Sequence, residues 1–214
     1  MDPKKVYTVD EALTLMKETS KVKFDASVEV HVKLGIDPKQ SEQLIRASVA
    51  LPHGSGKTVK VAAFVSDDQI AEAKKAGADI VGNKDLIEEI KKTGKCDFDV
   101  AIATPEIMKD LAAVARILGQ KGLMPNPKTG TITTKVGPTV TELKQGKVSF
   151  KNDNFGNIHV VIGKVSFDTT KLKENFEALF QALKKAKPEA KLKGNYLKAI
   201  YLSTSMGPSV KVSL

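Results

Sequence analysis

The chain has 214 residues, of which 41% are hydrophobic and 28% are charged, so a folded protein of one large or two small domains is expected and a disordered chain is excluded. Its formal net charge of +9 favours a polyanionic partner, although a lysine-rich soluble surface would have the same composition. The sequence has neither an apolar run of bilayer length nor a secretory signal, so we expect a cytoplasmic protein with no membrane partner. Cys96 is the single cysteine, so we expect no intrachain disulfide and no cysteine metal cluster.

Lysine supplies almost all of the positive charge. Arg46 and Arg116 are the two arginines. Lysine lacks the planar fork with which arginine reads guanine edges, so a nucleic acid bound here would be recognised through shape, hydroxyl groups and phosphates. That mode is typical of structured RNA.

The N-terminal third predicts a helix and a strand. Thr8-Val9-Asp10-Glu11 is a capping box, and the helix after it places Ala12, Leu13 and Met16 towards a core. Strict alternation over residues 27–34 then predicts a strand with one buried and one wet face. Its apolar residues are Val28, Val30, Val32 and Leu34, and its polar residues are Ser27, Glu29, His31 and Lys33. Residues 44–51 fit a second strand or a helix, and residues 52–56 form a break and a candidate hinge.

The middle third alternates strands and helices. Apolar strands are predicted at residues 59–65, 79–81 and 97–103. The first helix would be capped by Asp67 and ended by Gly77, the second capped by Asn83 and ended by Gly94, and the third opened by Thr104-Pro105. This alternation indicates a parallel sheet that is covered on both faces.

The last third returns to alternation. A short helix is predicted at residues 140–144, a strand from Lys147, and further strands at 158–164 and 196–203. Between these two lies a helix with an apolar stripe that includes Leu172, Phe176 and Leu179. We therefore expect an open α+β domain formed by both termini, residues 1–54 and 149–214, and an inserted α/β domain, residues 55–148. The net charges of 1–54, 55–148 and 149–214 are 0, +3 and +6, so the terminal segments are the better candidates for polyanion contact.

No motif predicts catalysis, a cofactor or a metal. Gly54-Ser55-Gly56-Lys57-Thr58 resembles a phosphate loop, but the first glycine of that motif is replaced by Leu51 and the loop precedes a strand. His31, His53 and His159 are far apart in the sequence and lack ligand spacing. Asp97 and Asp99 flank a strand and are expected to be solvated or capping groups.

Two loops have both a structural and a functional interpretation. Residues 118–128 contain two glycines, two prolines and the apolar pair Leu123-Met124, which suits an inward-packed loop or a contact loop edged by Lys121 and Lys128. Residues 203–209 carry a row of hydroxyl groups with Gly207, which suits an ordinary turn or a close approach to a ribose-phosphate backbone.

Several stretches resemble the L-one family of large-subunit ribosomal proteins, of the bacterial type. They are Lys23-Phe24, residues 28–38 (VEVHVKLGIDP), residues 51–54 (LPHG), residues 77–79 (GAD), residues 122–127 (GLMPNP) and residues 205–210 (SMGPSV), and they span essentially the whole chain in order. The resemblance implies an open α+β sandwich with an inserted Rossmann-like three-layer α/β domain.

The resemblance also implies a function and partners. It implies a structural constituent of the large ribosomal subunit, not an enzyme, that binds the ribosomal RNA of the mobile stalk, assists release of deacylated transfer RNA from the exit site, and represses translation of its own messenger RNA through the leader. Off the cytoplasmic ribosome it would be a monomer.

The RNA contacts implied by the family fall on nine residues: Lys23, Phe24, Ser27, Glu29, Lys164, Ser203, Ser205, Met206 and Gly207. Three departures from the family pattern bear on binding. Ser205 replaces the usual threonine, Gln120-Lys121 replaces the usual Pro-Arg before Gly122, and the usual basic N-terminal extension is expected to be missing together with some affinity.

Two other functions fit the same residues less well. A small α/β enzyme using the middle domain would need a nucleophile beside a base, and no such pair is recognisable. A general DNA-binding or single-strand-binding module would need aromatic stacking platforms, but aromatic residues make up 5% and tryptophan is absent.

Overall fold

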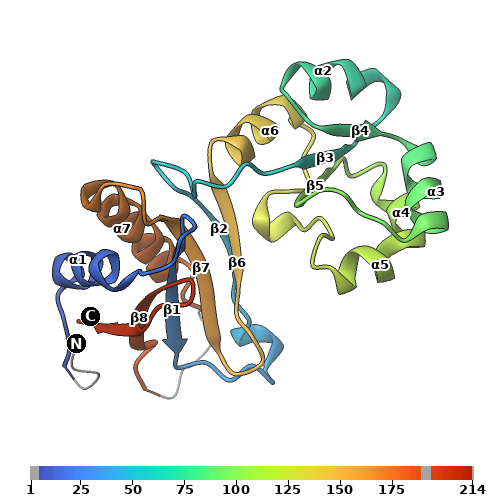
Figure 1. Cartoon of the computed structure of the whole chain (residues 1–214). Coiled ribbons are helices and arrows are strands. Elements are labelled where there is room, and N and C mark those ends of the chain that lie inside the picture. The colour runs from blue at the N-terminus through green and yellow to red at the C-terminus, as the bar shows by residue number, and fades with distance from the viewer. Residues whose placement is uncertain (1–4, 189–193, 214) are drawn as a thin grey trace. The chain divides into compact units, whose positions relative to one another are not determined.

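The chain forms two compact units, which the computed structural model describes for residues 5–188 and 194–213 (Figure 1). One unit consists of Met1–Lys57 and Gly146–Leu214, and the other of Thr58–Gln145. These junctions differ slightly from the predicted 54/55 and 148/149. Strand pairing explains the second difference, because strand β6 (Lys147–Lys151) pairs with strand β2 (Arg46–Ala50) of the terminal unit and therefore belongs with it.

The terminal unit is built on a four-stranded antiparallel sheet in the order β7-β1-β8-β9. The strands are β1 (Ser27–Leu34), β7 (Asn157–Lys164), β8 (Leu197–Thr204) and β9 (Ser209–Val212). The alternation predicted for β1 is confirmed: Val28, Val30 and Val32 are buried, and the residues between them are half-exposed. The strand β9 was not predicted, because its four residues follow a turn too closely to show a clear period.

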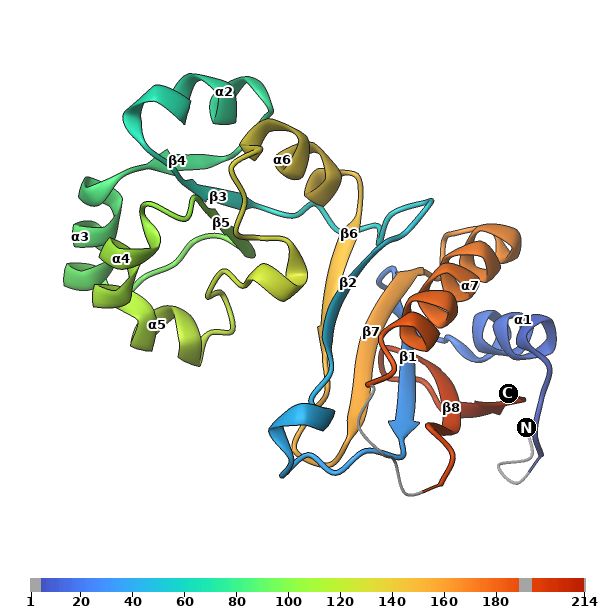
Figure 2. The same ribbon diagram turned by 180° about the vertical axis from the view of Figure 1, so that it is seen from behind.

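Helices α1 (Val9–Thr19) and α7 (Thr169–Lys185) contact each other and lie on one face of this sheet (Figures 1 and 2). Their buried side chains belong to the same core as the inner residues of β1, β7 and β8. The predicted capping box is confirmed, since the Thr8 hydroxyl accepts from the Glu11 N–H and the Glu11 carboxylate accepts from the Thr8 N–H. Both helices thus leave the outer face of the sheet to its polar side chains.

The β2–β6 pair and a short 3-10 helix (Ser41–Gln43) complete the terminal unit. Of the two interpretations of residues 44–51, the strand is confirmed and the helix is wrong. The buried residues Ile45, Val49 and Phe150 add this pair to the core beneath α7.

The other unit contains a three-stranded parallel sheet in the order β4-β3-β5. The strands are β3 (Val61–Phe64), β4 (Ile80–Gly82) and β5 (Val100–Ala103). Alternate residues of β3 enter two separate cores: Ala62 and Phe64 face one, and Val61 and Ala63 face the other. The predicted covering of both faces is confirmed.

Each face of the parallel sheet has its own helices. One core receives side chains from α3 (Lys84–Thr93), α4 (Met108–Leu111), a 3-10 turn (Ala112–Val114) and α5 (Ala115–Gln120). The other receives them from α2 (Ile70–Lys75), which follows a 3-10 turn (Asp67–Gln69), and from α6 (Val136–Lys144). A last 3-10 turn covers Pro127–Thr129.

Three predicted helix caps in this unit are wrong. The Asp67 carboxylate accepts a hydrogen bond from the Asn83 amide at 3.1 Å, and neither side chain caps its helix. Thr104 does not open a helix either, since α4 begins at Met108. Gly94 ends α3 with a φ of 65°, as predicted.

Candidate nucleic-acid interface

The predicted RNA contacts converge on one end of the four-stranded sheet. The strand register places Ser27 opposite Lys164 of β7, and Glu29 opposite Ser203 of β8. These residues come from three distant stretches of sequence, and all four side chains are on strands rather than on loose loops. Antiparallel pairing therefore fixes the spacing of a hydroxyl, a carboxylate and an ammonium group along a half-exposed surface.

The turn between β8 and β9 is tied to the start of β1. The Ser205 N–H donates to the Ser27 carbonyl at 3.0 Å, and the Ser205 hydroxyl accepts from the Ser27 N–H at 3.3 Å. These two bonds extend the ladder by one residue beyond β8. The backbone next to Met206 is consequently held in place at both sides, because the Gly207 N–H also donates to the Thr204 carbonyl at 2.8 Å.

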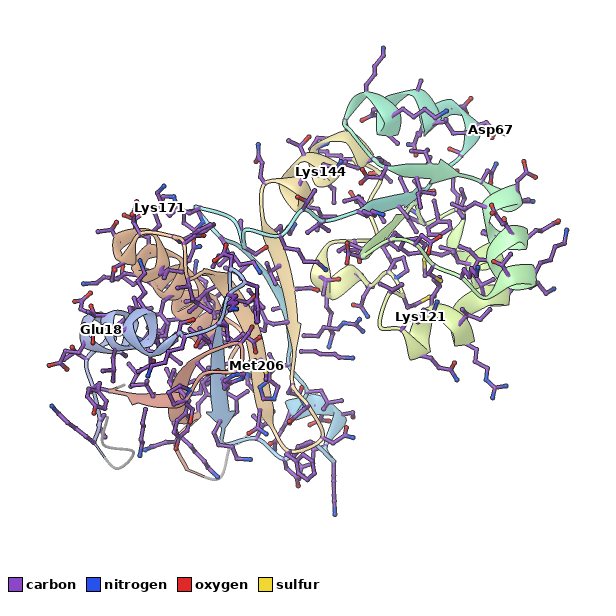
Figure 3. The ribbon with its side chains drawn as sticks, viewed as in Figure 1. Glu18, Asp67, Lys121, Lys144, Lys171 and Met206 are labelled. Carbon is purple, nitrogen blue, oxygen red and sulfur yellow. The ribbon has the colours of Figure 1, made fainter. Side chains whose placement is uncertain are left out.

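Met206 occupies a strained and exposed position in this turn (Figure 3). Its φ is +63°, in the left-handed region that costs a residue with a side chain about 1–2 kcal/mol, and it is the single non-glycine residue with positive φ among the residues described. Its side chain is 89% exposed. A strained backbone that presents an apolar side chain to solvent is characteristic of ligand-binding positions.

Gly207 is required by the packing beneath it. A Cβ atom at this position would lie 2.0 Å from the Thr204 hydroxyl oxygen, so any side chain would displace the turn. Thr204 itself is buried, and its hydroxyl has no hydrogen-bond partner. The glycine thus sets how closely a ligand can approach the backbone, which the sequence had indicated.

Phe24 and Lys23 lie just before β1, at the same end of the sheet as the β8–β9 turn. Phe24 is 57% exposed, so its apolar side chain, like that of Met206, faces solvent rather than a core. Lys23 is also exposed. Lys164 differs, because its ammonium group donates to the Ser27 hydroxyl at 2.8 Å and would have to exchange that bond for a phosphate contact.

Sequence reasoning missed a pair of histidines on the same face. His31 of β1 and His159 of β7 are opposite each other, with their Nδ1 atoms 2.7 Å apart. The Nε2 atom of His31 lies 2.9 Å from the Ser203 hydroxyl. The alternation of β1 already placed His31 on the wet face, but only the pairing of β1 with β7 brings His159 to it.

The loop of residues 118–128 lies in the other unit and favours the structural interpretation. Leu123 and Met124 pack against the core of that unit, and the Lys121 ammonium donates to the Gly94 carbonyl at 3.0 Å. Asn126 caps the short turn that follows by accepting from the Lys128 N–H. This loop therefore belongs to a different unit from the residues gathered on the four-stranded sheet.

The parallel sheet offers little to a catalytic interpretation. A hollow of about 430 Å³, lined by Lys60 and residues 96–99, lies at the amino ends of β3 and β5. Ligands of open α/β sheets bind instead at the carboxyl ends of the strands. Within residues 5–188 and 194–213, the His, Cys, Asp and Glu side chains form no group of three or more that could bind a metal ion. Among the same residues, a helix with the length and hydropathy of a membrane span is absent.

The site therefore has the character of a binding surface on a rigid sheet, and comparison with known proteins identifies the family. The family model described as "Ribosomal protein L1p/L10e family" matches residues 16–208. A curated relative, the large ribosomal subunit protein uL1 of Kosmotoga olearia, is 48% identical over 212 residues, which cover 99% of this chain and 91% of the relative. The chain belongs to the ribosomal protein L1p/L10e family. It is a large-subunit ribosomal protein and not an enzyme, so the enzyme interpretation of the middle unit is wrong.

Proposed function

We propose that the protein binds the ribosomal RNA of the mobile stalk through the end of the four-stranded sheet where β1, β7 and β8 meet. The observation that carries the proposal is the convergence of the nine predicted contacts, from residues 23–29, 164 and 203–207, at one end of the sheet, where they are half-exposed or exposed. Hydroxyl groups of Ser27 and Ser203 suit ribose, and backbone N–H groups and lysines suit phosphates. Exposed Phe24 and Met206 supply apolar contact to a base or sugar.

A salt titration with full-length protein tests this proposal. Each phosphate that lysine neutralises should add roughly 0.7–0.9 to the slope of log affinity against log salt. We expect a steep slope and strong preference for stalk RNA over a hairpin of the same length and unrelated sequence. A slope near zero, or equal affinity for both RNAs, would contradict the proposal.

The remaining parts of the function rest on the family resemblance. On the ribosome in the cytoplasm, the protein would assist release of deacylated transfer RNA from the exit site. Off the ribosome it would act as a monomer that represses its own messenger RNA, because a leader that mimics the stalk would occupy the same surface. Competition measures the second part: unlabelled messenger leader should displace stalk RNA completely if both use one site.

The domain organisation is part of the same proposal. The terminal unit would be the RNA-binding domain, an open α+β sandwich, and Thr58–Gln145 would be an inserted Rossmann-like three-layer α/β domain. The parallel sheet with helices on both faces supports the second assignment. The location of all nine predicted contacts outside residues 58–145 supports the first.

A further inference from the structure

The two histidines on the open face form a contact that must hold a proton. His31 and His159 face each other with Nδ1 atoms 2.7 Å apart and ring centroids 5.0 Å apart. At this distance one ring donates an N–H and the other accepts it. The outer nitrogen of each ring lies near a carboxylate: Nε2 of His31 is 3.7 Å from Glu29 Oε2, and Nε2 of His159 is 3.5 Å from Asp153 Oδ2.

Counting protons shows which forms of the pair these neighbours accept. Two neutral rings have two protons for four nitrogens, and one of those protons lies between the rings. If His159 donates it, the bare Nε2 of His159 faces Asp153. If His31 donates it, the bare Nε2 of His31 can accept from the Ser203 hydroxyl, 2.9 Å away, and the Nε2–H of His159 faces Asp153. A third proton gives both outer nitrogens an N–H, which faces Asp153 from His159 and Glu29 and Ser203 from His31. A fourth would place two cationic rings in contact, so the pair suits one extra proton and no more.

The groups around His31 lower its pKa in the free protein. Burial lowers the pKa of His31, the neighbouring His159 lowers it further, and Glu29 raises it. Burial would raise the pKa of Asp153, but hydrogen bonds from Asn157 and Phe155 outweigh it and bring the value to about 2, so this carboxylate stays ionised. In the free protein His31 therefore takes up a proton at a lower pH than an ordinary histidine does.

The other charged and titratable neighbours leave the pair available to a ligand. On β1, the Lys33 ammonium donates to the Phe155 carbonyl at 2.6 Å rather than to a histidine. On β8, Tyr201 is opposite His31 in the register, and Ser203 is the residue that the His31 ring contacts. Because Ser203 is also one of the proposed RNA contacts, an RNA on this surface would bring phosphates close to the pair.

We propose that RNA binding draws one proton into the His31–His159 pair, so that affinity for RNA rises as the pH falls. The inference rests on the proposed function. Phosphates add negative charge beside the rings and favour the protonated form. A proton that is taken up on binding strengthens binding as the pH falls through the range between the pKa of the pair in the complex and its lower pKa in the free protein.

The test measures the affinity of full-length protein for transcribed stalk RNA at pH 6 and pH 8 and at one ionic strength. For the parent protein we expect binding about three- to tenfold tighter at pH 6, as one linked proton allows. The variants His31→Gln and His159→Gln keep a polar side chain but cannot titrate, so both should lose most of this difference. His53→Gln is the matched control, because the third histidine is bound to Glu174 of α7 at 2.5 Å, away from the open face.

A second measurement covers the case of a variant that fails to fold. Histidine C2–H resonances of the parent protein, titrated with and without stalk RNA, should show an upward shift of the pair's midpoint on binding and no shift for His53. Equal pH dependence in the parent and in folded His159→Gln would overturn the inference, as would unshifted midpoints. If the parent binds equally well at both pH values, this inference alone fails, whereas a parent that binds at neither pH contradicts the proposed function.

Discussion

Ser205 shows how one hydroxyl group serves both the turn and the surface. Its Oγ accepts from the Ser27 N–H while its own N–H closes the ladder to β1. The resemblance implies a threonine as the family's usual residue at this position, and a threonine would keep the hydroxyl and add a methyl group. The position therefore offers a substitution that removes the hydroxyl and one that retains it.

We expect Ser205→Ala to weaken RNA binding by about 1–3 kcal/mol, because the Ser27 N–H and any ribose hydroxyl lose their partner. Ser205→Thr, the matched control, should bind at least as well as the parent. Filter binding gives the affinities, and thermal unfolding must show that both variants remain folded. Parent-like binding by Ser205→Ala would mean that the hydroxyl row is merely a turn.

Gly207 gives a second prediction at the residue scale. Gly207→Ala places a methyl group against the Thr204 hydroxyl, where a Cβ would lie 2.0 Å away, and should cost about 1–3 kcal/mol of stability as an overpacked site. RNA binding should fall as Met206 is displaced. Adding Thr204→Ala removes the obstructing atom, so the double variant should recover much of both losses in thermal unfolding and filter binding. If Thr204→Ala rescues neither, the close contact is not the cause.

At the scale of an element, the turn that joins β6 to β7 should make the unfolding free energy depend on pH. The Asp153 carboxylate accepts hydrogen bonds from the Phe155 and Asn157 N–H groups at 2.8 and 2.7 Å. Its pKa in the folded protein is about 2, below the ordinary 3.8. A lowered pKa contributes stability above 3.8 that is lost as the pH falls towards 2. Asp153→Asn should therefore flatten the decline in unfolding free energy over this window, measured by urea titration; an unchanged decline would contradict the assignment.

Local sequence patterns correctly predicted the elements that depend on residues close to one another in the chain. The period of two in β1 and the capping box of α1 depend on neighbours within a few residues, and both are confirmed. Caps in the shorter helices were wrong, since the Asp67 carboxylate finds the Asn83 amide instead of a backbone N–H. A side-chain partner of this kind competes with the cap, and the local sequence does not reveal it.

The site was predictable only in part, for a related reason. The exposed side chains of β1 follow from alternation, but the pairing of β1 with β7 and β8 joins residues more than a hundred positions apart. Nothing in the spacing of His31 and His159 indicates that their rings touch. Family resemblance supplied the contacts at residues 203–207, whereas the residues alone left that segment open between an ordinary turn and a contact with a ribose-phosphate backbone.

At the scale of the whole molecule, the chain leaves and re-enters the terminal unit at one place. The Leu51 N–H donates to the Gly146 carbonyl at 3.3 Å, and a Cβ on Gly146 would lie 2.4 Å from the Cα of Gly54. Residues 54 and 146 are therefore neighbours in space although the other unit is inserted between them. Such adjacent ends allow an insertion to be removed without stretching the host.

We predict that a variant in which a short glycine linker joins Gly54 directly to Gly146 still binds stalk RNA. The β2–β6 pair remains, because the join preserves Lys147 and Val148 opposite Ala50 and Val49. The deleted residues build separate cores, and closing the gap costs little entropy for so short a loop. Filter binding should give an affinity within about tenfold of full-length protein, roughly 1.4 kcal/mol.

The control for this prediction is cooperative unfolding, followed by circular dichroism, since a collapsed variant would lose binding for a trivial reason. Ser205→Ala in the joined background should weaken binding by the same factor as in full-length protein, because the altered surface is identical and distant sites act additively. If the joined variant unfolds cooperatively but binds stalk RNA no better than an unrelated hairpin, recognition depends on the deleted residues 55–145. The nine contacts assigned to the terminal unit would then be insufficient, and the lysines of the middle unit would become the next candidates for substitution.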